Sequence, residues 1–436
     1  MKMKMRKHLS APGLLKIART QFAKSKAPSE APSLRYSLTD CLMSGLAVFG
    51  LKCPSLLDFD EYRNKELVRY NLSKLYGVDQ APCDTQLRAR LDEVPPTIFP
   101  GVYKGLFSAV QRGKVLPLYE SLEGYYIISA DGSGVFHSNQ IHCSSCCVKR
   151  HRDGTVSYYH QILSAVMVHP DQREVIPMYS EAIIQQDGTN KNDCERNASQ
   201  RLWKQLRRMH PNLKMLAVED ALYANGPHID LLNALSIAYV LNVKPKDHKW
   251  LFDWVRAYPE QPYVIERDNK RYELTWHNNV PLNESRDDLR VNFLECWETD
   301  AKGKRQHFTW VTNFKITKDN AMTLMKIGRS RWKIENETFN TLKNQGYHFE
   351  HNFGHGYKHL CNVFAHLMML AFLIDELQQM CCPLFQQALK ACIRRRRLWE
   401  KMRHWCTNCY VISWEALYHA IISPPNFSLP KPPDTS

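Results

Sequence analysis

Three acidic residues that are far apart in the chain stand where a carboxylate can do chemistry. Asp131 follows the apolar run 125–130, and Asp220 lies at the end of the apolar run 213–218. Glu335 ends the basic stretch Gly-Arg-Ser-Arg-Trp-Lys-Ile-Glu. Oxygen ligands of this kind hold Mg²⁺, and two such ions can stabilise the attacking and leaving oxygens of an in-line phosphoryl transfer. The pattern therefore predicts a two-metal site that acts on DNA, with both aspartates at strand ends and the glutamate on a helix.

The helix expected to carry Glu335 also carries positive charge. Arg331 lies four residues before Glu335, and Lys343 lies about two turns after it, so both are expected on nearly the same face as the carboxylate. Trp332 and Ile334 are expected to face inward. Guanidinium and ammonium groups at these positions can hold a DNA strand and offset developing negative charge. The candidate DNA-binding residues of this helix are Arg329, Arg331, Lys333 and Lys343.

The elements that would position these residues have a recognisable order. The apolar runs 125–130, 158–169 and 175–179 predict three strands, because they are short and rich in β-branched and aromatic residues. Helix, strand, helix and strand follow between residues 194 and 243. Three strands followed by this alternation predict an α/β fold with a ribonuclease-H-like mixed sheet flanked by helices. Strand-like segments between residues 250 and 312 predict a β-rich insertion before a helix over 317–345.

Changes in composition along the chain divide it into seven segments. We expect a basic mobile arm (1–34), a helical DNA-end-binding domain (35–118) and the first part of the catalytic core (119–248). The β-rich insertion (249–314), the second part of the core (315–378), a C-terminal helical segment (379–423) and a Pro-rich tail (424–436) should follow.

Composition excludes a disordered protein and favours a polyanionic partner. Hydrophobic residues make up 44% of the 436 residues, and the chain has ten Trp and twenty Tyr. The formal net charge is +14, which favours phosphate-rich partners because each neutralised phosphate releases counterions. No apolar segment of signal type follows the charged N-terminus. The apolar stretch 363–374 contains a histidine and is too short to span a bilayer, so a buried helix is expected.

In these motifs the chain resembles the DDE transposases of bacterial insertion sequences, specifically the insertion-sequence-four-like group. That group has a Tyr-x2-Arg-x3-Glu-x6-Lys pattern on its last catalytic helix, commonly with Trp after the Arg and Ile before the Glu. The matching residues here are Arg331, Trp332, Ile334 and Glu335. Gly328 stands at the tyrosine position, and Lys343 comes one residue late, after Leu342. These departures leave open whether Glu337 takes the place of Glu335. We favour Glu335, because Arg-Trp-x-Ile-Glu is the more specific half of the pattern.

The resemblance implies two divalent ions in one site, Mg²⁺ or Mn²⁺ in its place, with Asp131 bridging both and Asp220 and Glu335 each binding one. It implies cleavage at the ends of a mobile element by water, followed by attack of the freed 3′-hydroxyl on target DNA. The implied partners are double-stranded DNA, both element ends and target, and a second copy of the chain in a synaptic homodimer. A bacterial cytoplasmic, nucleoid-associated protein without membrane contact is expected.

Two further points stay open at this stage. The resemblance implies an aromatic side chain in the insertion that stacks on a flipped base, and three tryptophans are available, with Trp310 taken as the candidate beside Trp276 and Trp297. A nuclease that cuts without joining, and an inactive DNA-binding repressor, remain alternative functions.

A cysteine-rich segment invites a zinc interpretation. Cys143 and Cys147 bound the sequence Cys-Ser-Ser-Cys-Cys, and His137, His142 and His151 lie nearby. A Cys-x2-Cys pair needs a second pair of ligands at suitable spacing, and these histidines do not form one. Reduced thiols in a β-hairpin are therefore the preferred interpretation, with structural zinc as the alternative.

Overall fold

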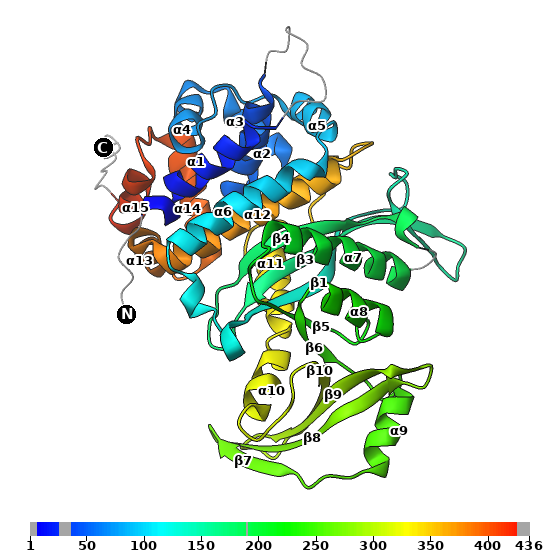
Figure 1. Cartoon of the computed structure of the whole chain (residues 1–436). Helices are drawn as coiled ribbons and strands as arrows, with labels where there is room; N and C mark the ends of the chain where they lie inside the picture. Colours follow the sequence, from blue (N-terminus) through cyan, green and yellow to red (C-terminus); the bar gives the residue numbers. More distant parts are fainter. Residues whose placement is uncertain (1–6, 26–35, 189–190, 425–436) are drawn as a thin grey trace, which may run out of the picture.

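A computed structural model describes residues 7–25, 36–188 and 191–424 of the chain. Helices from both ends of the chain form one layer, a mixed sheet with its own helices lies below it, and a β-rich extension continues the sheet at the opposite end (Figure 1). The expected α/β class with a ribonuclease-H-like sheet is confirmed.

Five strands make the core of the sheet, in the spatial order β4-β3-β1-β5-β6. Strand β3 is antiparallel to both of its neighbours, β4 and β1, whereas β5 and β6 run parallel to β1. Parallel neighbours require crossover connections, which helices α7 and α8 supply. The bounds are β1 (Tyr126–Ser138), β3 (Val156–Val168), β4 (Ile176–Ile183), β5 (Met215–Glu219), β6 (Ala238–Asn242), α7 (Lys191–Met209) and α8 (Gly226–Ala234), with the short β2 (Cys147–Arg150) paired to the start of β3.

The β-rich insertion extends this sheet. Strand β10 pairs antiparallel with β6, and β9, β8 and β7 follow in order, so core and insertion share one ladder of hydrogen bonds. The elements are α9 (Lys249–Ala257), β7 (Tyr263–Arg267), β8 (Lys270–Asn283), β9 (Arg286–Thr299) and β10 (Arg305–Thr312).

The chain returns to the core as a broken helix, where a single helix over 317–345 was expected. It consists of α10 (Ala321–Arg329), a π-helical segment η6 (Ile334–Phe339) and α11 (Asn340–Asn344). Residues Ser330 and Arg331 separate the first two pieces as a turn. The backbone N–H of Asn340 donates to the Glu335 carbonyl, which is the five-residue spacing of a π-helix.

The helical layer combines segments from both ends of the chain. Its N-terminal members are α1 (Ala11–Phe22), α2 (Leu38–Gly50), α3 (Leu56–Arg63), α4 (Glu66–Tyr76), α5 (Asp84–Asp92) and α6 (Phe99–Arg112). Its C-terminal members are α12 (Leu360–Cys381), α13 (Pro383–Cys392), α14 (Arg395–Asn408) and α15 (Trp414–Ile422). Single-turn helices are η1 (Lys7–Leu9), η2 (Pro96–Ile98), η3 (Leu116–Leu118), η4 (Leu122–Gly124) and η5 (Gln185–Asp187).

The expectation of a mobile arm over residues 1–34 is wrong for residues 7–25. Helix α1 packs against α6 and buries Leu14, Ala18 and Phe22. These apolar residues recur every four positions, which is the spacing of one buried helix face. Residues 1–6 and 26–34 of the expected arm, and residues 425–436 of the expected tail, lie outside the described residues.

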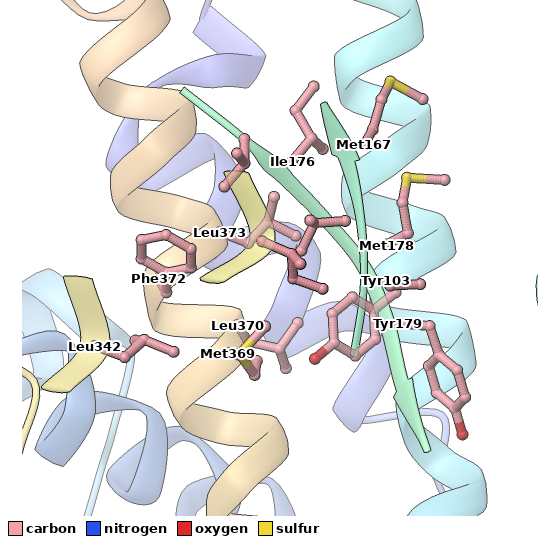
Figure 2. Packing of buried hydrophobic residues seen from close by; sticks show 14 of the residues in the cluster. Tyr103, Met167, Ile176, Met178, Tyr179, Leu342, Met369, Leu370, Phe372 and Leu373 are labelled. Atoms are coloured by element: carbon pink, nitrogen blue, oxygen red, sulfur yellow. The ribbon is translucent and has the colours of Figure 1, made fainter. Parts of the chain in front are cut away.

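Helix α12 is the centre of the hydrophobic core. Figure 2 shows apolar side chains of α12, β4 and α6 filling the space between these elements, and Tyr103 of α6 lies edge to face on Tyr179 of β4 with 5.7 Å between ring centroids. Within the described ranges, α12 is the one helix long and apolar enough to cross a membrane, and its apolar window is completely buried in the fold. The stretch 363–374 is therefore part of a buried core helix, as expected.

Candidate active site

Two aspartates meet at the point where the ladder between β1 and β5 ends. The last residue pairs of this parallel ladder are Ile128 with Ala217 and Ser129 with Val218. Continuing the register by two residues places Asp131 level with Asp220, on the same face of neighbouring strands. Strand β5 ends at Glu219, so beyond the ladder the space beside β1 is no longer filled by a paired strand.

Asp131 does not end its strand, contrary to expectation. Strand β1 continues to Ser138, because Gly132, Ser133 and Gly134 remain paired with β3 and the register shifts only after Gly134. What ends at Asp131 is the pairing with β5 alone. A carboxylate in the middle of a strand therefore still lies at an opening in the sheet.

The neighbouring Glu219 has a different role. Its side chain is fully buried, accepts a hydrogen bond from Trp203 Nε1 at 2.9 Å and lies 2.6 Å from His228 Nε2. Because side chains alternate along a strand, this arrangement commits Glu219 to the side covered by α7 and α8. Asp220 instead forms a turn in which its carboxylate accepts the backbone N–H of Leu222 at 2.9 Å.

Arg331 joins the third acidic residue to the first. Its guanidinium lies 2.7 Å from the Glu335 carboxylate and 3.7 Å from that of Asp131. The Ser129 hydroxyl, two residues before Asp131 on the same face of β1, donates to the Arg331 carbonyl at 3.2 Å. Sequence reasoning missed this contact, which fixes the turn before η6 against the sheet. The structure thus brings Asp131, Arg331 and Glu335 together beside Asp220.

Burial changes the ionisation of Asp131. Loss of solvent raises the pKa of its carboxyl group to about 7, although Arg331 and the Gly132 N–H oppose the rise. The charges of Glu335 and Asp220 add to the rise by a smaller amount. Desolvation is therefore the larger cause of the rise, and repulsion among the acids is a smaller one.

The donor set fits divalent cations. Three carboxylates face a region where, among the described residues, Arg331 is the cation in ion-pair contact with two of them. Asp131 is largely buried and Glu335 is about half exposed, so the site is shielded from solvent at Asp131 and open to solvent at Glu335. Such hard oxygen ligands suit Mg²⁺ or Mn²⁺.

Comparison with known proteins assigns the chain to a family. The transposase DDE domain matches residues 155–374, just over half of the chain. The chain belongs to this family of DDE transposases. No curated protein matches it. The matched segment includes Asp220 and Glu335 but begins after β1. The assignment of Asp131 to the site is therefore supported by the strand register and the Arg331 contact, not by the family match. Members of the family generally use divalent metal ions.

Glu337, the alternative third acid of this DDE-family chain, points to a different neighbour. Its carboxylate lies 3.6 Å from Arg173 in the connection between β3 and β4. Glu335 and Glu337 are thus held by different arginines, and only the partner of Glu335 also contacts Asp131.

The other basic candidates of the broken helix have partners within the chain. Arg329 forms an ion pair with Glu298 of β9 and lies over the Phe308 ring at 4.2 Å, so it attaches α10 to the insertion. Lys333 donates to the Gln172 carbonyl at 2.5 Å. Lys343 forms an ion pair with Glu350 at 3.2 Å, whereas Glu335 pairs with Arg331.

The tryptophans are distributed differently from expectation. Trp310 is 1% exposed and stacks on Phe308, so neither face of its ring is free for a base. Trp297 is stacked between His307 and Arg305. Trp332, expected to face inward, is 44% exposed next to Arg331, whereas Ile334 is buried as expected. The turn at Ser330 and Arg331 breaks the helical periodicity from which the orientation of Trp332 was predicted.

Proposed function

We propose that this protein is a transposase of the insertion-sequence-four-like group that binds the terminal inverted repeats of its element and performs metal-dependent strand cleavage and transfer. Two observations carry the proposal: the parallel register of β1 and β5, continued by two residues, sets Asp131 level with Asp220, and Arg331, in the turn before η6, contacts both Asp131 and Glu335. The family match makes DNA the substrate class. The protein would act in the bacterial cytoplasm on nucleoid DNA, as a homodimer on paired element ends.

In this proposal Asp131, Asp220 and Glu335 would together hold two divalent ions, Mg²⁺ or Mn²⁺. The ions supply Lewis-acid activation of the attacking oxygen and stabilisation of the leaving oxygen. Asp131 gives up its proton when a cation binds, since ligand carboxylates must be ionised. Arg331, which forms ion pairs with Asp131 and Glu335, would be able to bind the scissile phosphate once cations neutralise these carboxylates. Ser129 would position Arg331, because its hydroxyl donates to the backbone carbonyl of Arg331.

The third acid in the proposal is Glu335. Support comes from the shared arginine: Arg331 contacts Glu335 and Asp131, and Arg173 contacts Glu337 at the edge of the site. Arg329 and Lys333 are proposed as structural supports of this helix, with Lys343 free to exchange its Glu350 partner for a DNA phosphate.

The test is cleavage of a labelled DNA end. The substrate is an oligonucleotide duplex that carries one inverted repeat of the element and its flanking sequence, incubated with the protein and Mg²⁺. We expect a nick at the repeat end and, with target plasmid present, joined products. Asp131→Asn, Asp220→Asn and Glu335→Gln should each reduce nicking by about 100-fold or more, because each removes a ligand at the reacting phosphate. DNA binding should survive.

Glu337→Gln is the matched control for Glu335→Gln and should retain most of the activity. Loss of nicking in Glu337→Gln with full activity in Glu335→Gln would move the third ligand. Nicking without any joined product would favour the nuclease, and DNA binding without nicking by the unaltered protein would favour the repressor. Full activity in both aspartate variants would refute the mechanism.

A further inference from the structure

Four potential metal ligands from three separate segments converge near the catalytic core. Cys143 and Cys146 lie in the connection between β1 and β2, His160 lies in β3, and His355 lies between α11 and α12. Their sulfur and nitrogen atoms all lie within 4.8 Å of one another. Cys146, His160 and His355 are buried, and Cys143 is partly exposed.

Five of the six distances within this cluster are close to those of a tetrahedral site, and the sixth, between Cys143 Sγ and His355 Nε2, is at most 4.8 Å. Cys143 Sγ and Cys146 Sγ are 3.9 Å apart, and His160 Nε2 lies 3.4 and 3.3 Å from the two sulfurs. His355 Nε2 lies 3.1 Å from both Cys146 Sγ and His160 Nε2. Zinc bonds of about 2.3 Å to sulfur and about 2.0–2.1 Å to nitrogen give tetrahedron edges of roughly 3.8 Å (S–S), 3.5 Å (S–N) and 3.4 Å (N–N). The five separations agree with these edges within about 0.4 Å.

We propose that Cys143, Cys146, His160 and His355 bind one structural Zn²⁺ ion. Two thiolates and two imidazoles in a tetrahedron are a ligand set that selects zinc over magnesium, calcium or manganese, which prefer oxygen. Four protein ligands leave no position for water or substrate, so this zinc supports the structure and takes no part in the reaction. The site is separate from the proposed magnesium site, because His160 lies four residues before Ser164, the partner of Asp131, or roughly 13 Å along β3.

Hydrogen bonds around the cluster orient its ligands. The second ring nitrogen of His355, Nδ1, donates to the Gly356 carbonyl at 2.5 Å, which leaves the lone pair of Nε2 directed into the cluster. The Cys143 backbone N–H donates to Cys146 Sγ at 3.4 Å, and the Cys146 N–H donates to the Cys143 carbonyl at 3.2 Å. The tight turn therefore presents both sulfurs on one side.

The proposed zinc would join the sheet to the segment that leads from the Glu335 helix to α12. His355 lies between Gly354 and Gly356, whose φ angles of 142° and 69° bend the backbone sharply. The Asp92 carboxylate of α5 accepts the next four backbone N–H groups, those of residues 357–360. Zinc on one side and Asp92 on the other would thus fix this segment against the sheet and the helical layer.

The sequence favoured reduced thiols over zinc because the second pair of ligands, His160 and His355, does not lie at a recognisable spacing from the cysteines. His160 is fourteen residues after Cys146, and His355 is 209 residues after it. No spacing rule connects a hairpin to a segment so far along the chain. The three histidines considered from the sequence, His137, His142 and His151, are not among the converging ligands.

The experiment is metal analysis of the full-length protein, purified under reducing conditions without chelator. We expect about one zinc per chain by plasma mass spectrometry. The variants Cys146→Ser and His355→Ala should lose it, with a lower thermal midpoint. The matched controls His142→Ala and Cys83→Ser change a histidine and a cysteine that lie outside the cluster, and both should keep the metal. Co²⁺ exchanged into the unaltered protein should give the visible absorption of a tetrahedral thiolate site.

The cobalt spectrum decides the question if the ligand variants fail to fold, because it needs only the unaltered chain. Protein that contains no zinc and takes up neither Zn²⁺ nor Co²⁺ when reduced would overturn the proposal. So would a Cys143–Cys146 disulfide in the freshly purified protein. Zinc that is retained in a Cys143→Ser, Cys146→Ser double variant but lost in Asp131→Asn would place the metal at the carboxylates and would equally overturn it. None of these results depends on DNA cleavage, so the zinc site and the proposed function are tested separately.

Discussion

Among single residues, Trp332 lies exposed beside Arg331, and in the proposed function it would contact DNA there. Its ring is 44% exposed although it follows Arg331 directly, and exposed tryptophans next to a phosphate-binding group provide a stacking surface for bases. We predict that Trp332→Ala lowers affinity for the element end by about 1–3 kcal/mol, roughly 5- to 150-fold. Fluorescence anisotropy with the labelled end, in Ca²⁺ to prevent cleavage, measures the change.

Trp250 offers a matched control for that experiment. It is exposed to the same 44% but lies at the start of α9, on the far side of the insertion. Trp250→Ala should bind the element end like the unaltered protein. Equal losses in both variants would mean that exposed aromatic area in general, and not the position beside Arg331, accounts for binding.

Residues could be predicted where the signal lies in neighbouring sequence positions, but not where it depends on contacts with residues far along the chain. Asp131 and Asp220 were found because each follows a run of apolar β-type residues, and that signal needs only a few neighbouring positions. The buried state of Trp310 could not be found, because it depends on Gly328, where even a Cβ atom would come within 2.4 Å of the indole nitrogen. Gly328 also stands where the insertion-sequence-four-like group, which the sequence resembles, has tyrosine, and a side chain of that size at this position would collide with the buried Trp310.

At the scale of elements, the π-helical segment accounts for an irregular spacing in the sequence. The insertion-sequence-four-like pattern has six residues between Glu and Lys, and here seven separate Glu335 from Lys343. A π-bulge accommodates one extra residue in an α-helix, and η6 overlaps the first part of this interval. Periodicity of 3.6 residues could not predict it, because a one-residue insertion leaves the apolar pattern on either side intact.

Also at this scale, one carboxylate holds the start of α12. Asp92 of α5 accepts the backbone N–H groups of residues 357–360, and the last of these, from Leu360, is one of the donors at a helix start that have no partner inside the helix. We predict that Asp92→Ala lowers the free energy of unfolding by about 2–4 kcal/mol, since the unpaired donors lose both their acceptor and a charge at the helix N-terminus. The adjacent Glu93, paired with Lys358 on the surface, is the control, and Glu93→Ala should cost less than about 1 kcal/mol. Urea denaturation measures both.

The same residue gives that stability a pH dependence. Burial raises the pKa of Asp92, but the four N–H groups lower it by more, so the carboxyl group titrates below its usual value of 3.8. A carboxyl group whose pKa is lower in the folded than in the unfolded chain stabilises the fold fully above the unfolded value, and this stabilisation is lost as the pH falls through the folded value. The difference between the unaltered protein and Asp92→Ala should therefore be constant near neutrality and shrink below about pH 4. A difference that grows on acidification would contradict this account.

For the whole molecule, connectivity across the chain decided what the sequence could reveal. The order of strands and helices from β1 to β6 indicated the ribonuclease-H-like core, because each step is a short and regular connection. The continuity of core and insertion depends on the pairing of β10 with β6, which joins residues about seventy positions apart. Likewise, α1 was mistaken for part of an arm because its buried face is matched by α6, far along the chain. Such pairings leave no mark on local composition.

The net charge of +14 leads to a last prediction, about assembly on DNA. Two such chains repel each other in solution, and two DNA ends between them would remove that repulsion, so we predict a monomer alone and two chains in the complex with paired element ends. Binding that neutralises six to ten phosphates should weaken by about 10³- to 10⁵-fold between 50 and 200 mM salt. Light scattering coupled to gel filtration gives the stoichiometry, and anisotropy titrations give the salt dependence. A scrambled duplex of equal length should show a similar salt dependence with weaker binding, because phosphate contacts carry no sequence information. Affinity that does not respond to salt, or one chain per pair of ends at saturation, would show that charge does not drive the assembly.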